Sequence, residues 1–254
     1  MNVKFFFICL ICCLFSCRGK KTASETANDC VVVATSSWTA AYAQAAGADK
    51  ITVLAPFEMA HPSEYELRPG DIPKLMDATL IIYAGYEVMT ERLKKGLDLP
   101  AGKLLQIETE YNYESMEKSI MKIAAQLGTE NIARENLSEI RRAFDDGKKA
   151  VEELQMANRL VVAHRFQSSI AQELGIIPDI IFGPASPEAS EIITVSKSGA
   201  LLIIDNFHNP VGQPFKEVLP NAQYFRLLNF PGPQGTKTLT DIIRHNVSQF
   251  MNNK

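Results

Sequence analysis

Short apolar runs alternate with helix-like segments from residue 30 onward, and this alternation most constrains the fold. The first block holds expected strands at 30–34, 51–54, 80–83 and 104–108, separated by expected helices at 36–47, 71–77 and 88–96. Strands that alternate with helices typically form a parallel sheet with crossover helices. The first block therefore predicts one α/β unit.

The same alternation restarts in the second half of the chain. Expected strands lie at 159–163, 180–182, 200–204 and 223–228, and expected helices at 166–174, 188–198, 215–219 and 238–251. No sequence repeat between the two halves is evident. The chain thus predicts an α/β fold with two lobes, each with a mainly parallel sheet and flanking helices.

A helical region without strands separates the two blocks. Apolar positions at helical spacing predict helices over 114–127 and 131–154, and the second would be roughly 35 Å long at 1.5 Å per residue. A helix of that length can join two lobes. We expect an N-terminal lobe at 30–130, a bridging helix at 131–157 and a C-terminal lobe at 158–254.

The N-terminus carries an export signal. Lys4 precedes an apolar run over 5–15, which is shorter than the roughly 20 residues that span a bilayer. The run ends in Leu14-Phe15-Ser16-Cys17, which resembles a bacterial lipoprotein cleavage site. We expect a signal peptide at 1–16, lipid on Cys17 and a polar tether at 17–29. An ordinary secretion signal or an N-terminal membrane anchor is the alternative.

Processing at this site would remove or modify most of the cysteines. Only Cys30 would keep a free thiol, so no internal disulfide is expected. The formal net charge is −3 and no basic block stands out, so no nucleic-acid partner is expected. We expect a monomer held to the bacterial membrane by lipid, facing the periplasm or the cell exterior.

Three of the four histidines follow expected strands. His61 lies in the loop after the second expected strand. His164 directly follows the expected strand at 159–163, and His208 lies four residues after the end of the expected strand at 200–204. Ligands of open parallel sheets bind beyond the carboxyl ends of the strands. The alternative is that each histidine has only a structural role, capping a strand or filling a loop. His245 lies within the closing helix and is expected to be solvated or capping.

Two carboxylates occupy similar positions. Glu87 follows the strand that ends at residue 83, and Asp205 directly follows the strand at 200–204. Imidazole and carboxylate together suit Zn²⁺ and, less strongly, Mn²⁺ or iron. The polar run over 205–210 could instead form an Asx-type turn. Trp38 is expected in the core.

Three segments resemble the substrate-binding proteins of zinc and manganese ABC transporters, often called cluster 9. They are residues 61–87, with a histidine, a Tyr-Glu pair and a Tyr-x-Gly turn, residues 161–175 around His164, and residues 238–246. The resemblance runs from residue 30 to the C-terminus. It implies two α/β lobes bridged by a rigid helix, and a membrane permease as partner.

The ligand pattern departs from that family. The first family histidine would fall at Ser63, the second has no match in 108–113, the third matches His164, and the aspartate corresponds to Asn229. One interpretation is that other residues replace the missing ligands and complete the coordination sphere of the metal. The metal ligands would then be His61, His164, Glu87, His208 and Asp205, with Glu108 or Glu110 as weaker options. The other is a degenerate site that binds metal weakly, or binds something else.

The sequence therefore predicts a binding protein rather than an enzyme. It would capture a divalent metal ion, zinc with manganese as the alternative, for an ABC transporter membrane permease. One rival is a zinc-dependent hydrolase with Glu87 or Asp205 as general base. Another is a surface protein for cell adhesion, or a binder of a chelated metal or other small ligand.

Overall fold

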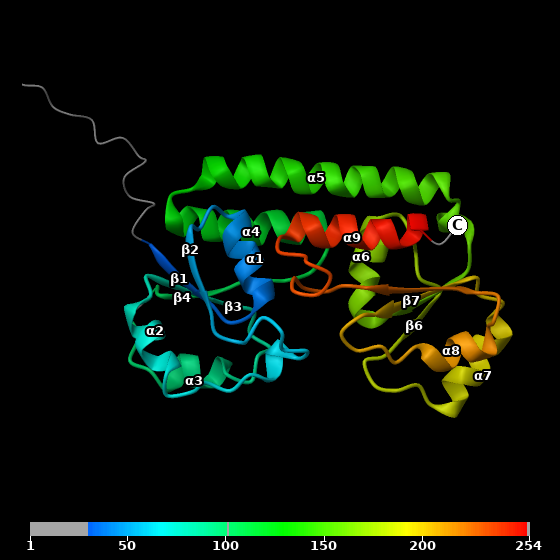
Figure 1. Ribbon diagram of the computed structural model, residues 1–254, viewed down its shortest axis with the longest axis horizontal. Coiled ribbons are helices and arrows are strands. Elements are labelled where there is room, and N and C mark those ends of the chain that lie inside the picture. Colours follow the sequence, from blue (N-terminus) through cyan, green and yellow to red (C-terminus); the bar gives the residue numbers. More distant parts are fainter. Residues whose placement is uncertain (1–29, 101, 253–254) are drawn as a thin grey trace, which may run out of the picture.

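The computed structural model describes residues 30–100 and 102–252. Two α/β lobes lie side by side beneath a shared layer of long helices (Figure 1). This confirms the predicted fold class. The predicted signal peptide, the lipidation site Cys17 and most of the tether lie outside the described residues.

The N-terminal lobe is built on a four-stranded parallel sheet. Its strands are β1 (Val31–Ala34), β2 (Lys50–Val53), β3 (Leu80–Tyr83) and β4 (Leu104–Gln106), in the order β2-β1-β3-β4. The accompanying helices are α1 (Ser37–Ala45), α2 (Asp71–Asp77) and α3 (Thr90–Lys95). The inner strands β1 and β3 are apolar because neighbours cover both of their faces.

The C-terminal lobe repeats this topology. Its strands are β5 (Val161–His164), β6 (Ile180–Phe182), β7 (Leu202–Asn206) and β8 (Gln223–Leu227), in the parallel order β6-β5-β7-β8. Its helices are α6 (Ser168–Glu173), α7 (Ala189–Ser198) and α8 (Gln213–Val218). If the four strands of each lobe are counted in chain order, both sheets have the spatial order second, first, third, fourth.

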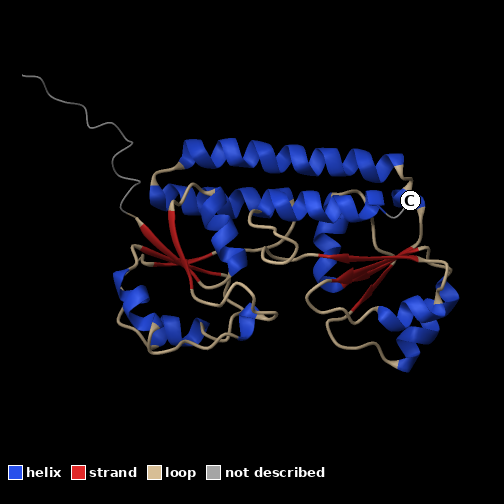
Figure 2. Cartoon of the chain, in the orientation of Figure 1, coloured by secondary structure: helices blue, strands red, loops and turns tan. Residues whose placement is uncertain are grey.

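A helical layer joins the lobes. The helix α5 (Glu130–Glu153) runs across α4 (Tyr113–Leu127) and α9 (Leu239–Asn252), and the three lie over both sheets (Figure 2). At 24 residues α5 is about 36 Å long. Its buried face includes Leu137, Ile140, Phe144 and Val151, which belong to one apolar cluster shared by both lobes. The shared core ties the two lobes together.

Several strand ends differ from the expected boundaries, and two of these differences involve predicted ligands. The strand β7 continues through Asp205, which pairs with Arg226 of β8, although the sequence placed Asp205 just beyond the strand. Likewise His164 is the last residue of β5 and pairs with Phe182. The apolar pattern stops one residue before the ladder ends in β5 and two residues before it ends in β7, because backbone pairing does not depend on the polarity of the side chain. Across the described ranges, no helix is both long and apolar enough to span a membrane.

Candidate metal and ligand site between the lobes

A cavity of about 580 Å³ lies between the lobes. The N-terminal lobe contributes Trp38, from the first turn of α1, and Tyr111, from the segment between β4 and α4. The C-terminal lobe contributes His208 and Phe230, from the loops after β7 and β8. The carboxyl ends of both sheets therefore open onto the same cavity, as expected for parallel α/β folds.

Four aromatic rings form a line across the cavity wall. Tyr111 stacks on Trp38 with ring centroids 5.7 Å apart, and Trp38 lies 6.2 Å from Phe230 of the other lobe. Phe230 in turn stacks on His208 at 3.6 Å. Each such aromatic pair is worth about 0.5–1.5 kcal/mol beyond the area that it buries. The line holds the lobes in contact and fixes the ring of His208.

His208 and His61 approach the cavity from opposite lobes. His61 is exposed and directly precedes a short 3₁₀ turn, Pro62–Glu64, while the ring of His208 is largely buried. Burial first, and then the nearby charge of His61, lower the pKa of His208 to about 4, against an opposing backbone hydrogen bond with Phe230. The imidazole of His208 is therefore neutral at pH 7, which is the form that binds a metal ion.

Glu87 also lines the cavity, but its carboxylate is occupied by hydrogen bonds. Oε1 accepts from the Thr35 hydroxyl at 2.6 Å and from the Ala84 N–H at 2.8 Å. Oε2 accepts from the Gly85 N–H at 2.6 Å and from the Thr90 hydroxyl at 3.4 Å. Gly85 has a φ of 101°, a conformation that favours glycine. Glu87 therefore organises the turn after β3.

His164 is fully buried at the end of β5 and does not line the cavity. Its Nδ1 accepts a hydrogen bond from the Phe166 N–H at 3.1 Å, and its ring packs between Phe166 and Phe182. Nε2 has no hydrogen-bond partner in the described part of the chain and lies against Gly183. Burial lowers the pKa of His164, and the charge of Asp205 opposes that shift.

Asp205 is likewise fully buried and does not line the cavity. Oδ1 accepts from the Asn206 N–H at 2.8 Å, and Oδ2 accepts from the Gly212 N–H at 2.8 Å and the Tyr224 hydroxyl at 2.5 Å. These contacts fix the loop after β7 to its own sheet. The carboxylate of Asp205 therefore has a structural task within the C-terminal lobe.

The polar run after β7 does form an Asx-type turn. The Asn206 side-chain oxygen accepts from the backbone N–H of His208 at 2.8 Å and of Asn209 at 3.3 Å. This is one of the two roles weighed for that run from the sequence. The turn nevertheless directs His208 to the cavity, so the local hydrogen bonds and the placement of a possible ligand are compatible.

The structure thus brings together only part of the predicted ligand set. His61, His208 and Glu87 line one cavity, whereas His164 and Asp205 lie within the C-terminal lobe. Within the residues described, no group of three or more His, Cys, Asp or Glu side chains is arranged to hold a metal ion. The five-residue set stays a prediction, and two imidazoles are the nitrogen donors at the cavity itself.

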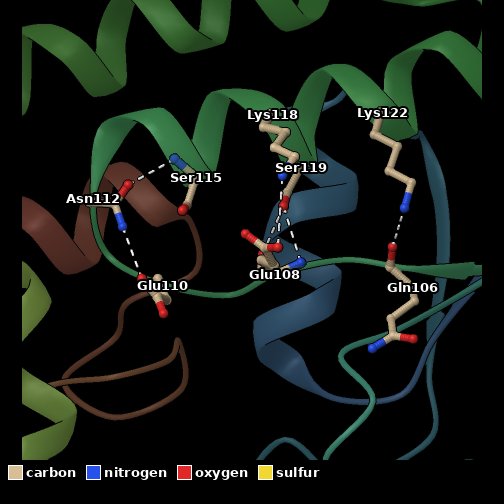
Figure 3. Close-up of polar contacts among 8 residues, drawn as sticks. All are labelled: Gln106, Glu108, Glu110, Asn112, Ser115, Lys118, Ser119 and Lys122. Carbon is tan, nitrogen blue, oxygen red and sulfur yellow. Dashed lines mark hydrogen bonds and ion pairs between the residues drawn. The ribbon is translucent and has the colours of Figure 1, made fainter.

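The segment after β4 supplies a cavity residue that the sequence reasoning missed. Figure 3 shows this segment fixed to α4: the Ser119 hydroxyl accepts from the Glu108 N–H and donates to the Glu108 carbonyl oxygen, and the Lys122 ammonium donates to the Gln106 carbonyl oxygen at 2.7 Å. Tyr111 is thereby held at the cavity, where a histidine had been sought.

Of the two carboxylates of this segment, Glu110 lines the cavity and Glu108 does not. Glu108 lies 3.8 Å from the Lys118 ammonium, and the Asn112 amide donates to Glu110 at 3.1 Å (Figure 3). Trp38, expected in the core, packs against the shared core and also lines the cavity. An aromatic residue shortly after a strand was the available sequence signal for Tyr111.

Comparison with known proteins supports the two-lobe assignment. No protein-family model matches the chain. The metal ABC transporter substrate-binding lipoprotein SsaB of Streptococcus sanguinis is 36% identical over 81 residues. That match covers 32% of this chain and spans 26% of the relative, about a quarter of its length.

Solved structures match over most of the chain. The Mn-bound periplasmic metal-binding protein of Candidatus Liberibacter asiaticus superposes with a TM-score of 0.67 at 20% identity, covering 88% of this chain and 99% of that one. The substrate-binding protein FpvC of P. aeruginosa, in complex with Ni²⁺, has a TM-score of 0.70 at 15% identity, covering 88% and 96%. The chain has the fold of these proteins, and the match to SsaB adds a sequence resemblance over 81 residues.

Proposed function

We propose that this protein is the extracytoplasmic substrate-binding component of an ABC transporter and captures a divalent transition metal in the cavity between its lobes. One observation carries the proposal. His61 and His208 reach the same cavity from opposite lobes, and the neutral imidazole of His208 has a buried Nε2 with no hydrogen-bond partner among the described residues. The similarity to manganese- and nickel-bound proteins supports the same conclusion.

Zinc is the proposed metal, with manganese as the alternative. Imidazole nitrogen suits zinc well, whereas manganese favours carboxylate and other oxygen ligands. Of the predicted ligands, His61 and His208 would bind directly, with Glu87 at the cavity wall. His164 and Asp205 would join only if the loops after β5 and β7 rearranged, because both are fully buried.

Binding fits the site better than catalysis. A hydrolase would need a carboxylate that is available as a general base beside the metal. Both oxygens of Glu87 accept hydrogen bonds, as do both oxygens of Asp205. Delivery of the metal to a membrane permease, and attachment through lipid on Cys17, remain proposals that come from the sequence.

Calorimetric titration of the metal-stripped protein with zinc, manganese and nickel tests the proposal. His61→Ala and His208→Ala should each weaken binding at least about tenfold, the effect of losing roughly 1.4 kcal/mol. His245→Ala is the matched control, since His245 lies in α9 and outside the cavity. His164→Ala tests whether the buried histidine takes part. Unchanged affinity in both the His61 and His208 variants would overturn the site.

A further inference from the structure

The cavity supplies few metal ligands for its size. A volume of about 580 Å³ lies within the range of pockets that hold organic ligands, which are roughly 300–1,000 Å³. Yet two imidazoles and two carboxylates line it, and of the carboxylates Glu87 is committed to its turn and Glu110 accepts a hydrogen bond from the Asn112 amide. Zinc usually takes four ligands. At least two positions around the metal must therefore be filled by something other than these two imidazoles.

Buried polar atoms without partners concentrate at this cavity. Across residues 30–100 and 102–252, four buried side-chain nitrogen or oxygen atoms lack a hydrogen-bond partner. Three belong to cavity-lining residues: Trp38 Nε1, the Tyr111 hydroxyl and His208 Nε2. An unpaired buried donor costs about 1–3 kcal/mol. Since the indole N–H can only donate, the missing partner of Trp38 is an acceptor atom.

Exposed aromatic rings from both lobes line the same cavity. Tyr86, which follows β3, is 57% exposed, and Phe166, which follows β5, is 53% exposed. A flat aromatic ligand would bury the apolar faces of these rings, whereas a single metal ion is too small to cover them. Arg165 adds a permanent positive charge to the lining, which suits an anionic carboxylate.

We propose that the cavity takes its metal as a complex with a small, anionic, aromatic chelator that binds the metal through oxygen atoms. This inference rests on the proposed function and names the chemical form of its substrate. His61 and His208 complete the coordination of the metal, while Trp38 and Tyr111 donate hydrogen bonds to chelator oxygens. Arg165 balances the negative charge of the chelator.

Zinc dipicolinate is a suitable probe, because this aromatic dicarboxylate takes three positions on zinc and leaves others open for imidazole. The metal-stripped full chain is titrated with zinc alone, with dipicolinate alone and with the preformed 1:1 complex. Iminodiacetate, which also binds zinc through one nitrogen and two carboxylates but has an amine in place of the pyridine ring, is the matched chelator. The zinc dipicolinate complex should bind about tenfold or more tighter than zinc alone or zinc iminodiacetate, a gain comparable to one buried hydrogen bond to a charged group.

Two conservative variants test the hydrogen bonds. Trp38→Phe and Tyr111→Phe keep a ring but remove the donor, so each should lose most of the gain in affinity from dipicolinate, measured as the ratio of the affinities for the complex and for zinc alone in the same variant. Tyr113→Phe, two residues beyond Tyr111 and outside the cavity, should keep the gain.

Each other outcome has a definite meaning. Equal affinity for zinc alone and for the complex would overturn the chelate and leave the proposed function intact. An equal gain from iminodiacetate would overturn the aromatic part of the inference. Binding of dipicolinate alone as tightly as its zinc complex, or no binding of any form, would overturn both the inference and the proposed function.

Discussion

The two lobes share one strand order but differ in the polar groups at the ends of their inner strands. Thr35 directly follows β1, and its hydroxyl binds Glu87 across the end of β3. By strand register, His164 is the counterpart of Thr35 in the C-terminal lobe. Its Nε2 has no hydrogen-bond partner in the described structure, and the Asp205 carboxylate is bound to its own loop and to β8.

This difference shows how one topology can serve two purposes. The N-terminal sheet ends in a closed hydrogen-bond network that fixes a cavity wall. The C-terminal sheet ends in two histidines, His164 and His208, whose Nε2 atoms are both buried without partners among the described residues. Buried polar groups are rarely left unpaired without a reason. Trp38 Nε1 and the Tyr111 hydroxyl are unpaired in the same way at the N-terminal side of the cavity, so the difference between the lobes lies at the ends of the inner strands.

The largest effect is expected from Glu87→Ala, which opens the closed network. The substitution leaves buried backbone N–H groups and the Thr35 hydroxyl without an acceptor, so the free energy of unfolding should fall by about 3–4 kcal/mol. Urea denaturation measures this loss of unfolding free energy. Glu91→Ala, at an exposed position in α3, is the control and should change stability little. A loss below about 1 kcal/mol would show that water replaces the carboxylate.

A smaller effect is expected from Gly183→Ala, which tests the close contact over His164. A Cβ at Gly183 would lie 2.6 Å from His164 Nε2, and the φ of 75° also disfavours alanine. We expect a loss of about 2–3 kcal/mol in the free energy of unfolding. Gly175→Ala separates the two causes, since Gly175 has a φ of 87° but open space at its Cβ, and should cost about 1 kcal/mol. Equal losses would mean that the contact is unimportant.

Thr35→Val should cost less again, because it removes a single donor to Glu87 while keeping the shape of the side chain. The expected loss is about 1–2 kcal/mol in thermal or urea unfolding. Thr35→Ser keeps the hydroxyl and should preserve most of the stability. If Val and Ser behaved alike, the Thr35–Glu87 hydrogen bond would not be what distinguishes the N-terminal lobe.

The smallest expected effect is on the stability of the protein in acid. It is tested with one aspartate from each lobe. Burial alone would raise the pKa of Asp71, but hydrogen bonds from the Arg68 N–H, Lys74 and Tyr65 lower it below its usual value. Asp241 likewise has a lowered pKa, because backbone N–H groups at the start of α9 outweigh its burial. Both carboxylates are therefore ionised more readily in the folded protein than in the unfolded chain.

A lowered folded-state pKa stabilises the protein above the unfolded pKa of about 3.9, and this contribution is lost as the pH falls through the folded value. Asp71→Asn and Asp241→Asn should therefore each reduce stability at pH 7 and flatten its decline below about pH 4. Urea midpoints measured between neutral pH and about pH 3 test this, with Asp49→Asn, an exposed position, as control. An unchanged slope in acid would contradict the assigned pKa shifts.

Most of the secondary structure was predictable from local pattern. Four apolar residues at 80–83 predicted β3 at its exact bounds, and the spacing of Leu137, Ile140 and Phe144 predicted the buried face of α5. The site was less predictable. His61 and His208 were expected to meet and do line one cavity, whereas the burial of His164 depends on the packing of Phe182 and Gly183 around it.

The sequence by itself determined the alternation of strands and helices, the long joining helix and the polar residues at the strand ends, because hydrophobic periodicity is a local property. Only the tertiary structure decided that the two sheets have the same strand order, although no sequence repeat is evident. It also decided that Tyr111, Trp38, Phe230 and His208 form one aromatic line. These residues come from one helix and three loops far apart in the chain, and only packing of the two lobes against a shared core brings them together.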